Sequence, residues 1–295
     1  MRSNEEQWKN TVHASRNSLL SDVVKRFVRN RAAMLGLLIL TLVIFVIIFA
    51  DVLAPASLVT AYNTKEKFQG PSARHWFGTD NLGRDMLARV MHGARISVGI
   101  GVGATMISLI LGAILAAICA LSKKADFVIM RVMDVGNCIP SVLLALVLLA
   151  IMGGSVANMM VTLTIVSVPG FVVRIRSVLL GLVEQDYVKA ARLSGTRTAK
   201  LVLRHILPNA MAPVIVDATM TVSSMMLSAA GLSFIGMGVS PPSPEWGAML
   251  NNAQRYFRTS FHMALFPGLA IALTALSINL VGDGLRDALD PKSLK

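Results

Sequence analysis

The stretch Ala-Ala-Met-Leu-Gly-Leu-Leu-Ile-Leu-Thr-Leu-Val-Ile-Phe-Val-Ile-Ile-Phe-Ala-Asp-Val-Leu fills residues 32–53 and is almost wholly apolar. A bilayer core about 30 Å thick needs about 20 apolar residues at a rise of about 1.5 Å per residue of α-helix. The stretch follows a polar segment, residues 1–31, and lacks the short apolar core and cleavage site of a secretory signal. We therefore predict a membrane-spanning anchor helix over residues 32–54.

Five more runs of the chain have similar length and composition. The chain is 54% hydrophobic and 15% charged, whereas an ordinary soluble domain is about 25% charged. Backbone groups in lipid must form their hydrogen bonds within their own segment, so each run is expected to be a helix. The sequence predicts an all-α polytopic membrane protein with six transmembrane helices. The five additional runs are Ile96–Leu121, Val135–Met152, Val156–Val173, Ala210–Met237 and Met263–Val281.

The positive charge follows membrane topology and does not indicate a nucleic-acid partner. The net charge is +12, and twenty of the 28 lysines and arginines fall in segments 1–31, 122–134, 174–209 and 282–295. Such residues concentrate on the cytoplasmic side, which places both termini inside. The expected organisation is a cytoplasmic tail, an extracytoplasmic loop over 55–95, a five-helix core over 96–281 with a cytoplasmic loop at 174–209, and a C-terminal tail over 282–295.

Three shorter segments outside the spans are expected to form helices. Residues 19–28 place apolar side chains on one face and basic ones on the other, typical of a helix on the lipid surface or of a partner's docking site. Within residues 76–85, Leu82 stands where calcium would need an oxygen donor, so we expect Thr79 or Asp80 to cap a helix over Leu82–Gly93. Apolar residues from Trp246 to Phe257 repeat at helical spacing and predict an amphipathic helix.

The fifth span is unusually rich in Ser, Thr, Gly and Met, which indicates that it faces a polar path more than lipid. Asp217, Ser224 and Ser228 are the candidates for lining that path, since a carboxylate inside a membrane is costly and usually functional. The alternative is that Asp217 pairs with an arginine of the adjoining loop. Pro169-Gly170 in the fourth span predicts a static kink or a gate.

The loop between the fourth and fifth spans has small residues on one helical face. Tyr187, Ala190, Ala191 and Ser194 recur at i, i+3, i+4 and i+7, which lets another surface approach closely. Gly195 permits a sharp turn. A second helix, with an apolar face formed by Thr198, Leu201, Val202, His205 and Ile206, is expected to end at Pro208. From periodicity alone, this loop could also be a hairpin that only joins two spans.

The chain shows none of the motifs of an enzyme. It has no Gly-x-x-x-x-Gly-Lys-[Ser/Thr] phosphate loop, no metal-binding His/Glu motif and no nucleophile paired with a base. Cys119 and Cys138 have neither metal-site spacing nor a disulfide framework. We expect no cofactor, no metal site and no catalytic residues in this chain.

Three motifs resemble the membrane subunits of dipeptide/oligopeptide/nickel ATP-binding-cassette importers. The family's coupling signature is matched by Ala190, Ala191, Gly195, Ile206, Leu207 and Pro208, although Lys189 stands where the family has an acidic residue. Residues 77–85 and 231–247 are also similar to family patterns. The resemblance implies a type I importer permease fold in which Tyr187 to Pro208 contact a separate ATPase.

The resemblance also implies partners and a location. It implies a second similar permease, two cytosolic ATPases that bind ATP and Mg²⁺, and an extracytoplasmic binding protein, in a bacterial or archaeal cytoplasmic membrane. Di- or oligopeptides are the expected cargo, with nickel or a metal chelate as the alternative. A secondary transporter or channel, driven by an ion gradient, and a membrane scaffold are the alternatives from other classes.

Overall fold

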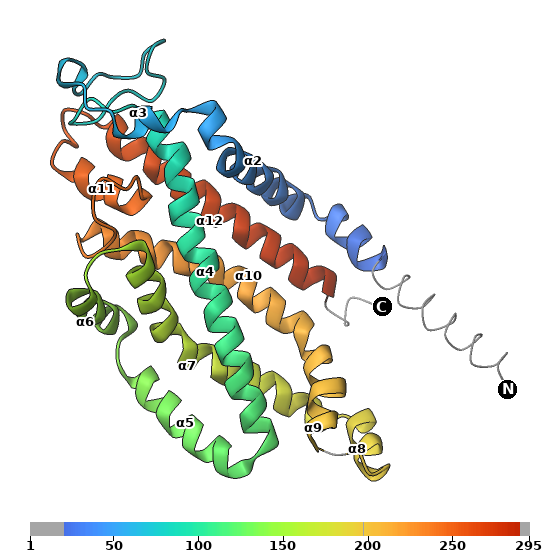
Figure 1. Ribbon diagram of the computed structural model, residues 1–295. Helices are drawn as coiled ribbons and strands as arrows, with labels where there is room; N and C mark the ends of the chain where they lie inside the picture. Colours follow the sequence, from blue (N-terminus) through green and yellow to red (C-terminus); the bar gives the residue numbers. More distant parts are fainter. Residues whose placement is uncertain (1–20, 197, 290–295) are drawn as a thin grey trace.

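The helices of this protein form an elongated bundle. The computed structural model describes residues 21–196 and 198–289. Figure 1 shows α3 and α11 near one end of the bundle and α8 and α9 near the other, here named the α11 end and the α8 end. The helices are α2 (Arg31–Leu53), α3 (Ala56–Thr60), α4 (Met86–Leu121), α5 (Lys123–Cys138), α6 (Ser141–Met152), α7 (Val156–Val183), α8 (Asp186–Leu193), α9 (Thr198–Leu201), α10 (Leu207–Phe234), α11 (Trp246–Gln254) and α12 (His262–Leu289).

Five of these helices, α2, α4, α7, α10 and α12, are long and apolar enough to cross a membrane. The pair formed by α5 and α6 passes the same test together, with a bend of 88° between its halves. If the bent pair is one crossing, the total is the six that the sequence predicts. The prediction of an all-α polytopic membrane protein is confirmed.

The third span is not the uninterrupted helix expected over Val135–Met152. α5 ends at Cys138 and α6 begins at Ser141, with Pro140 in the break. Proline lacks the N–H that would continue a helix and disfavours helical backbone in the residue before it. Ile139 accordingly has extended backbone, with φ −86° and ψ 126°.

The second span starts earlier than expected and includes the predicted separate helix. Asp85 caps α4 by accepting a hydrogen bond from the amide of Ala88 at 2.9 Å, and the helix then continues to Leu121. The expectation of a helix over Leu82–Gly93 capped by Thr79 or Asp80 is therefore wrong. Asp80 instead accepts two amides of the turn that follows it, at 2.8 and 3.0 Å.

Two helices continue past the ends of their apolar runs. α7 extends to Val183 and remains helical through Pro169-Gly170, so the expected kink does not interrupt it. α12 extends to Leu289, which makes much of the expected 282–295 tail helical, while residues 290–295 lie outside the described residues. An apolar run marks the depth of lipid that a helix crosses, and a helix can continue into water beyond it.

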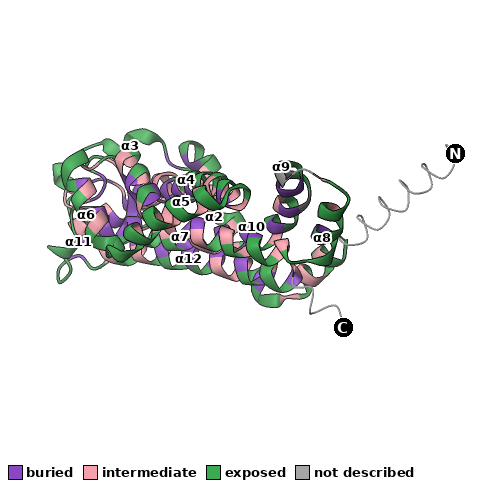
Figure 2. Cartoon of the chain, turned by 90° about the horizontal axis from the view of Figure 1, so that it is seen from below, coloured by how far each residue is buried: buried purple, intermediate pink, exposed green. Residues whose placement is uncertain are grey.

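α4 is the central helix of the bundle. It packs against α2, α7, α10 and α12, and its closest neighbour is α7. At Gly112, an added Cβ would lie 2.7 Å from the Cβ of Phe171 on α7. In Figure 2 the buried residues lie between helices and exposed residues cover the outside. That outer surface carries large apolar side chains such as Leu38, which suits lipid or another membrane subunit.

The N-terminal segment reaches α12. Residues 21–29 are helical, with Val24 and Val28 exposed, and Leu19 and Leu20 of the predicted amphipathic helix lie outside the described residues. Asn30 then caps α2 and donates to Asp287 of α12 at 3.4 Å. The start of the chain is thereby attached to the last helix, while its position on a lipid surface stays a prediction.

The close contact between α4 and α7 predicts a specific stability effect. Gly112→Leu is expected to lower the free energy of unfolding by about 1–3 kcal/mol, because the added side chain must push α7 away. Gly99→Leu is the control on the same helix, since a Cβ there meets nothing within 4 Å. Thermal unfolding in detergent measures both. Equal melting temperatures for the two variants would contradict this packing.

Candidate functional site

The segment from α8 to α10 is an exposed turn fixed to the bundle. α8 ends in a Schellman arrangement in which the amide of Gly195 donates to Arg192 O at 3.0 Å and the amide of Thr196 to Ala191 O at 3.2 Å. Gly195 has φ +77°, a backbone conformation that side chains other than glycine rarely adopt. The turn that the sequence predicts at Gly195 is present.

Apolar side chains anchor this segment. Val188 of α8 is fully buried, and Leu201, Val202 and Ile206 are at most 2% exposed. They pack in one cluster with Phe171, Ile175 and Leu179 of α7 and Ala210 and Val214 of α10. The segment therefore cannot move without displacing the ends of two membrane helices.

The opposite side of α8 is available to a partner. Tyr187, Lys189 and Ala190 are exposed, and Ala191 is half-buried. Lys189 lies 3.7 Å from Asp186 of the same helix. Leu193 is 90% exposed. Its exposure was not predicted from the sequence, because the spacing of apolar residues in α8 does not show which of them the bundle covers. Tyr187, Lys189 and Ala190 are thus accessible, whereas Ala191 packs partly against the buried cluster.

The second half of the predicted coupling segment differs from expectation at Pro208. The chain does not end a helix there: residues Val202–Ile206 form a π-helical turn that leads directly into α10, which starts at Leu207. The amide of Leu207 donates to Val202 O, five residues back. The wider turn brings the chain into α10 with Pro208 in its first turn, where the missing N–H costs nothing. Ile206 is buried, Leu207 is half-buried and Pro208 is exposed.

A cavity of about 590 Å³ lies between the α5–α6 break, α7 and α10. α10 contributes Thr221, Ser224 and Ser228, one helical face, so the two predicted serines do share a cavity. Their part in a translocation path stays a prediction. Sequence reasoning missed the polar residues that the other helices bring to this cavity, which are Asn137, Ser141, Ser167 and Arg174.

Asp217 pairs with an arginine, the alternative considered from sequence. Nε of Arg174 donates to Oδ2 of Asp217 at 2.7 Å, and both side chains are partly exposed. Arg174 lines the cavity, whereas Asp217 is not one of the residues that line it. The pair joins α7 to α10 near the α8 end. The expectation that Asp217 itself lines the path is therefore not supported by its position.

A second ion pair joins α7 to α5. Arg176 donates through Nε and Nη2 to the two carboxylate oxygens of Asp126, at 2.5 and 2.7 Å. Such a two-pronged pair fixes the guanidinium in one orientation. It holds the first half of the broken span beside α7, so that the break at Pro140 borders the cavity.

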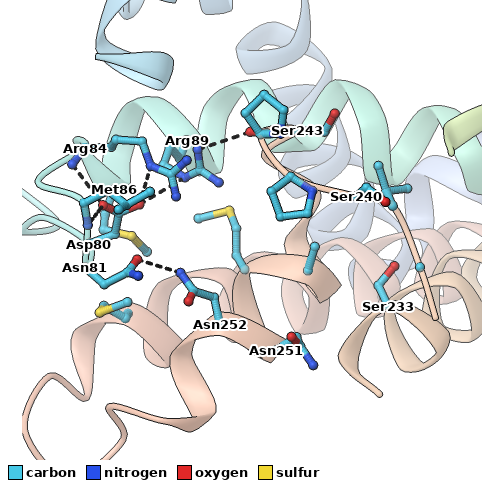
Figure 3. Close-up of a pocket in the computed structure, with 18 of the residues that line it drawn as sticks. Asp80, Asn81, Arg84, Met86, Arg89, Ser233, Ser240, Ser243, Asn251 and Asn252 are labelled. Carbon is cyan, nitrogen blue, oxygen red and sulfur yellow. Dashed lines mark hydrogen bonds and ion pairs between the residues drawn. The ribbon is translucent and has the colours of Figure 1, made fainter. Parts of the chain in front are cut away.

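A separate pocket of about 500 Å³ lies at the α11 end, between the start of α4, α11 and the loop before α11. Figure 3 shows Arg84 and Arg89 on either side of Asp80, and Asn81 facing Asn252. Arg84 Nε lies 2.7 Å from Asp80, and Asn252 donates to Asn81 at 2.8 Å. Backbone amides and arginines thus occupy the carboxylate of Asp80, which agrees with excluding calcium there.

The pocket at the α11 end is also where the expected short helix lies. α11 covers Trp246–Gln254, but Trp246 is 2% exposed and donates through its indole N–H to Val90 O at 2.9 Å. The first turn of α11 is capped by Glu245, which is fully buried. The helix is therefore part of the packed bundle and not a loosely attached surface anchor.

Two family matches cover most of this chain. Residues 89–295 match the family described as binding-protein-dependent transport system inner membrane component. Residues 18–71 match the N-terminal TM domain of oligopeptide transport permease C. The second match contains α2 and α3, and the first runs from Arg89, in the first turn of α4, through α12.

Relatives with established names cover nearly the full length. The dipeptide transport system permease protein DppC of Alkalihalophilus pseudofirmus is 40% identical over 92% of this chain and 89% of its own. The di/tripeptide transport system permease protein DppC of Pseudomonas aeruginosa is 43% identical, with 93% of each chain covered. The glutathione transport system permease protein GsiD of Escherichia coli is 42% identical over 91% of this chain and 89% of its own.

A solved structure has the same fold. A chain of the MetNI methionine ABC transporter, in an inward-facing conformation, has a TM-score of 0.57 and 16% identity to this chain, over 70% of this chain and 98% of its own. At that identity the likeness concerns the fold alone, and it agrees with the type I importer architecture expected from sequence. With the family match over residues 89–295 and relatives above 40% identity, this chain belongs to the binding-protein-dependent transport system inner membrane components, the permease subunits of ABC importers.

Proposed function

We propose that this permease moves di- or oligopeptides across a bacterial or archaeal cytoplasmic membrane and forms half of the translocation path. A second, similar permease forms the other half. Two cytosolic ATPases, which hold the ATP and Mg²⁺, supply the work, and an extracytoplasmic binding protein delivers the peptide. The observation that carries this proposal is the arrangement of an exposed turn on α8 and a cavity with polar residues in its wall, which share the helices α7 and α10.

The exposed side of α8 is the proposed contact with the ATPase. Ala190 and Ala191 are small, so a groove in the partner can reach the helix backbone, and the apolar side chain of Leu193 adds area to bury. The buried cluster beneath the helix makes the turn a stiff lever. A displacement of α8 by the ATPases then moves the ends of α7 and α10, and with them the cavity walls.

Peptide is the cargo that the cavity and the relatives favour. Relatives at 40–43% identity are named for dipeptides, di/tripeptides and glutathione, all of which contain peptide bonds. The cavity offers hydroxyl and amide groups that can bond to a peptide, together with the cation Arg174. A nickel ion would meet that cation, and no group of metal-binding side chains occurs among residues 21–196 and 198–289. Peptide is therefore preferred over nickel or a metal chelate.

Cytoplasmic exposure of α8 follows from the charge distribution and is part of the proposal. The segment 174–209 is basic, and the positive-inside rule places such a segment in the cytoplasm. α11 and the loop before it then face the extracytoplasmic side, where the binding protein docks.

Substitution of Ala190 tests the contact with the ATPase. Ala190→Glu is expected to lower ATP-driven peptide uptake at least about tenfold, because a bulky charge prevents close approach and costs at least about 1.4 kcal/mol of contact. Uptake by the importer in proteoliposomes measures this loss, and copurification of the ATPases shows whether it arises at the contact. Lys124→Gln, the same change of charge at an exposed position in α5, is the control and is expected to stay within about twofold of wild type. Normal uptake by Ala190→Glu would exclude this surface as the coupling contact.

Cysteine labelling tests the orientation. In a Cys138→Ser background, in which the remaining cysteine is buried, Leu193→Cys is expected to react with a membrane-impermeant maleimide only after spheroplasts are permeabilised. Arg255→Cys, at the α11 end, is expected to react in intact spheroplasts, since Arg255 is exposed. The opposite pattern would overturn the proposed topology and the position of the ATPases.

A further inference from the structure

Arg174 is the charged residue of the cavity wall. The remaining lining residues, contributed by α5, α6, α7 and α10, are polar or apolar but uncharged. Arg174 directly follows the apolar run of α7, and its guanidinium places a cation in the cavity wall. The cavity therefore presents a positive charge to whatever enters it.

The contacts of Arg174 orient its guanidinium toward the cavity. Nε donates to Asp217 at 2.7 Å, and the guanidinium carbon lies 4.8 Å from the centre of the Phe171 ring. A Cβ on Gly170 would lie 3.2 Å from Nη1, so the glycine leaves room for the group beside the helix. Asp217 and the Phe171 ring thus hold the guanidinium, and Gly170 leaves room for it. None of them accepts a hydrogen bond from its terminal nitrogens.

Those terminal nitrogens have no hydrogen-bond acceptor within the described part of the chain. Arg176, two residues along the same helix, differs, since Nε and Nη2 both bind the carboxylate of Asp126. Arg176 and Asp126 thus form a complete two-pronged ion pair. Among the described residues, Arg174 forms a hydrogen bond through Nε only, which leaves its Nη1 and Nη2 free. Two such nitrogens form a fork that can bind a carboxylate with two parallel hydrogen bonds.

Hydroxyl groups continue from this fork along the cavity. Asp217, Thr221, Ser224 and Ser228 follow one face of α10 at i, i+4, i+7 and i+11. The hydroxyls of Ser224 and Ser228 have no partner among residues 21–196 and 198–289. A ligand with a carboxylate at one end and amide groups behind it matches this order of cation and hydroxyls.

We propose that Arg174 forms a carboxylate-binding subsite of the cavity, which binds the C-terminal carboxylate of a peptide through Nη1 and Nη2. Asp217 acts as a positioning residue that holds Nε and keeps the fork facing the cavity. The subsite rests on the proposed peptide transport. It adds a selectivity for peptides with a free C-terminal carboxylate, separate from the selectivity of the binding protein.

The test compares a peptide acid with its amide in the complete reconstituted importer. Uptake of Ala-Ala and of Ala-Ala-amide is measured with the same binding protein, so that its own preference cancels when acid-to-amide ratios are compared between permease variants. Arg174→Gln is expected to lower this ratio about tenfold, equivalent to about 1.4 kcal/mol. Arg174→Lys, which keeps the charge but not the fork, is expected to give an intermediate ratio.

Two further variants separate a ligand-binding role from a structural one. Asp217→Asn removes the negative charge but keeps a side-chain oxygen that can accept from Nε of Arg174, so it is expected to keep most of the acid-to-amide preference even if uptake falls. Arg176→Gln removes an arginine of the same helix outside the cavity and is expected to change uptake of both peptides equally. An unchanged ratio in Arg174→Gln, or an equal loss in Asp217→Asn, would overturn the subsite.

A binding measurement keeps the subsite testable apart from transport. Ser224→Cys in the Cys138→Ser background is expected to be protected from a small thiol reagent by Ala-Ala and less by its amide, and Arg174→Gln is expected to remove the difference. Equal protection by acid and amide in the arginine-containing protein contradicts the subsite. A complex that imports neither peptide, while this difference in protection persists, contradicts the proposed function and leaves the subsite supported.

Discussion

A helix that crosses lipid must satisfy its backbone N–H and C=O groups internally, and the rest of this structure depends on that constraint. It produces the long helices α2, α4, α7, α10 and α12. It also restricts where the backbone can be irregular. The break at Pro140 borders a cavity lined in part by polar side chains, and the turn at Gly195 lies outside the helices that are long and apolar enough to cross a membrane.

The packing of α7 connects the two functional features. Its last turns, with Ile175 and Leu179, bury the side chains that anchor α8 and the π-helical turn. The same helix carries Arg174 and Gly170 on the face toward the cavity. In the proposed mechanism, a force applied at α8 reaches the cavity wall through these packed helices, because packed helices move as stiff bodies. The cavity and the proposed coupling surface therefore share one packed unit.

Sequence reasoning found part of the cavity and missed its charge. Ser224 and Ser228 were accessible to prediction because they share a polar face within an otherwise apolar span, a local property of α10. Arg174 follows the apolar run of α7 and looks like the first residue of a basic loop. Only the continuation of α7 to Val183, and the contact with Asp217 across 43 positions of sequence, bring it to the cavity. The exposure of Leu193 could not be predicted from sequence either, because it depends on which side of α8 the bundle covers.

The sequence by itself determined the all-α membrane architecture, the family and the turn at Gly195, because these follow from hydrophobic length, local motifs and the φ that glycine allows. The tertiary structure decided where helices end and which polar groups meet. Proline at 140 breaks a span whereas proline at 169 does not, and Asp85 caps α4 while Asp80 is occupied by Arg84. Several neighbouring groups compete for each of these roles, and the local sequence pattern does not specify which of them pair in the folded chain.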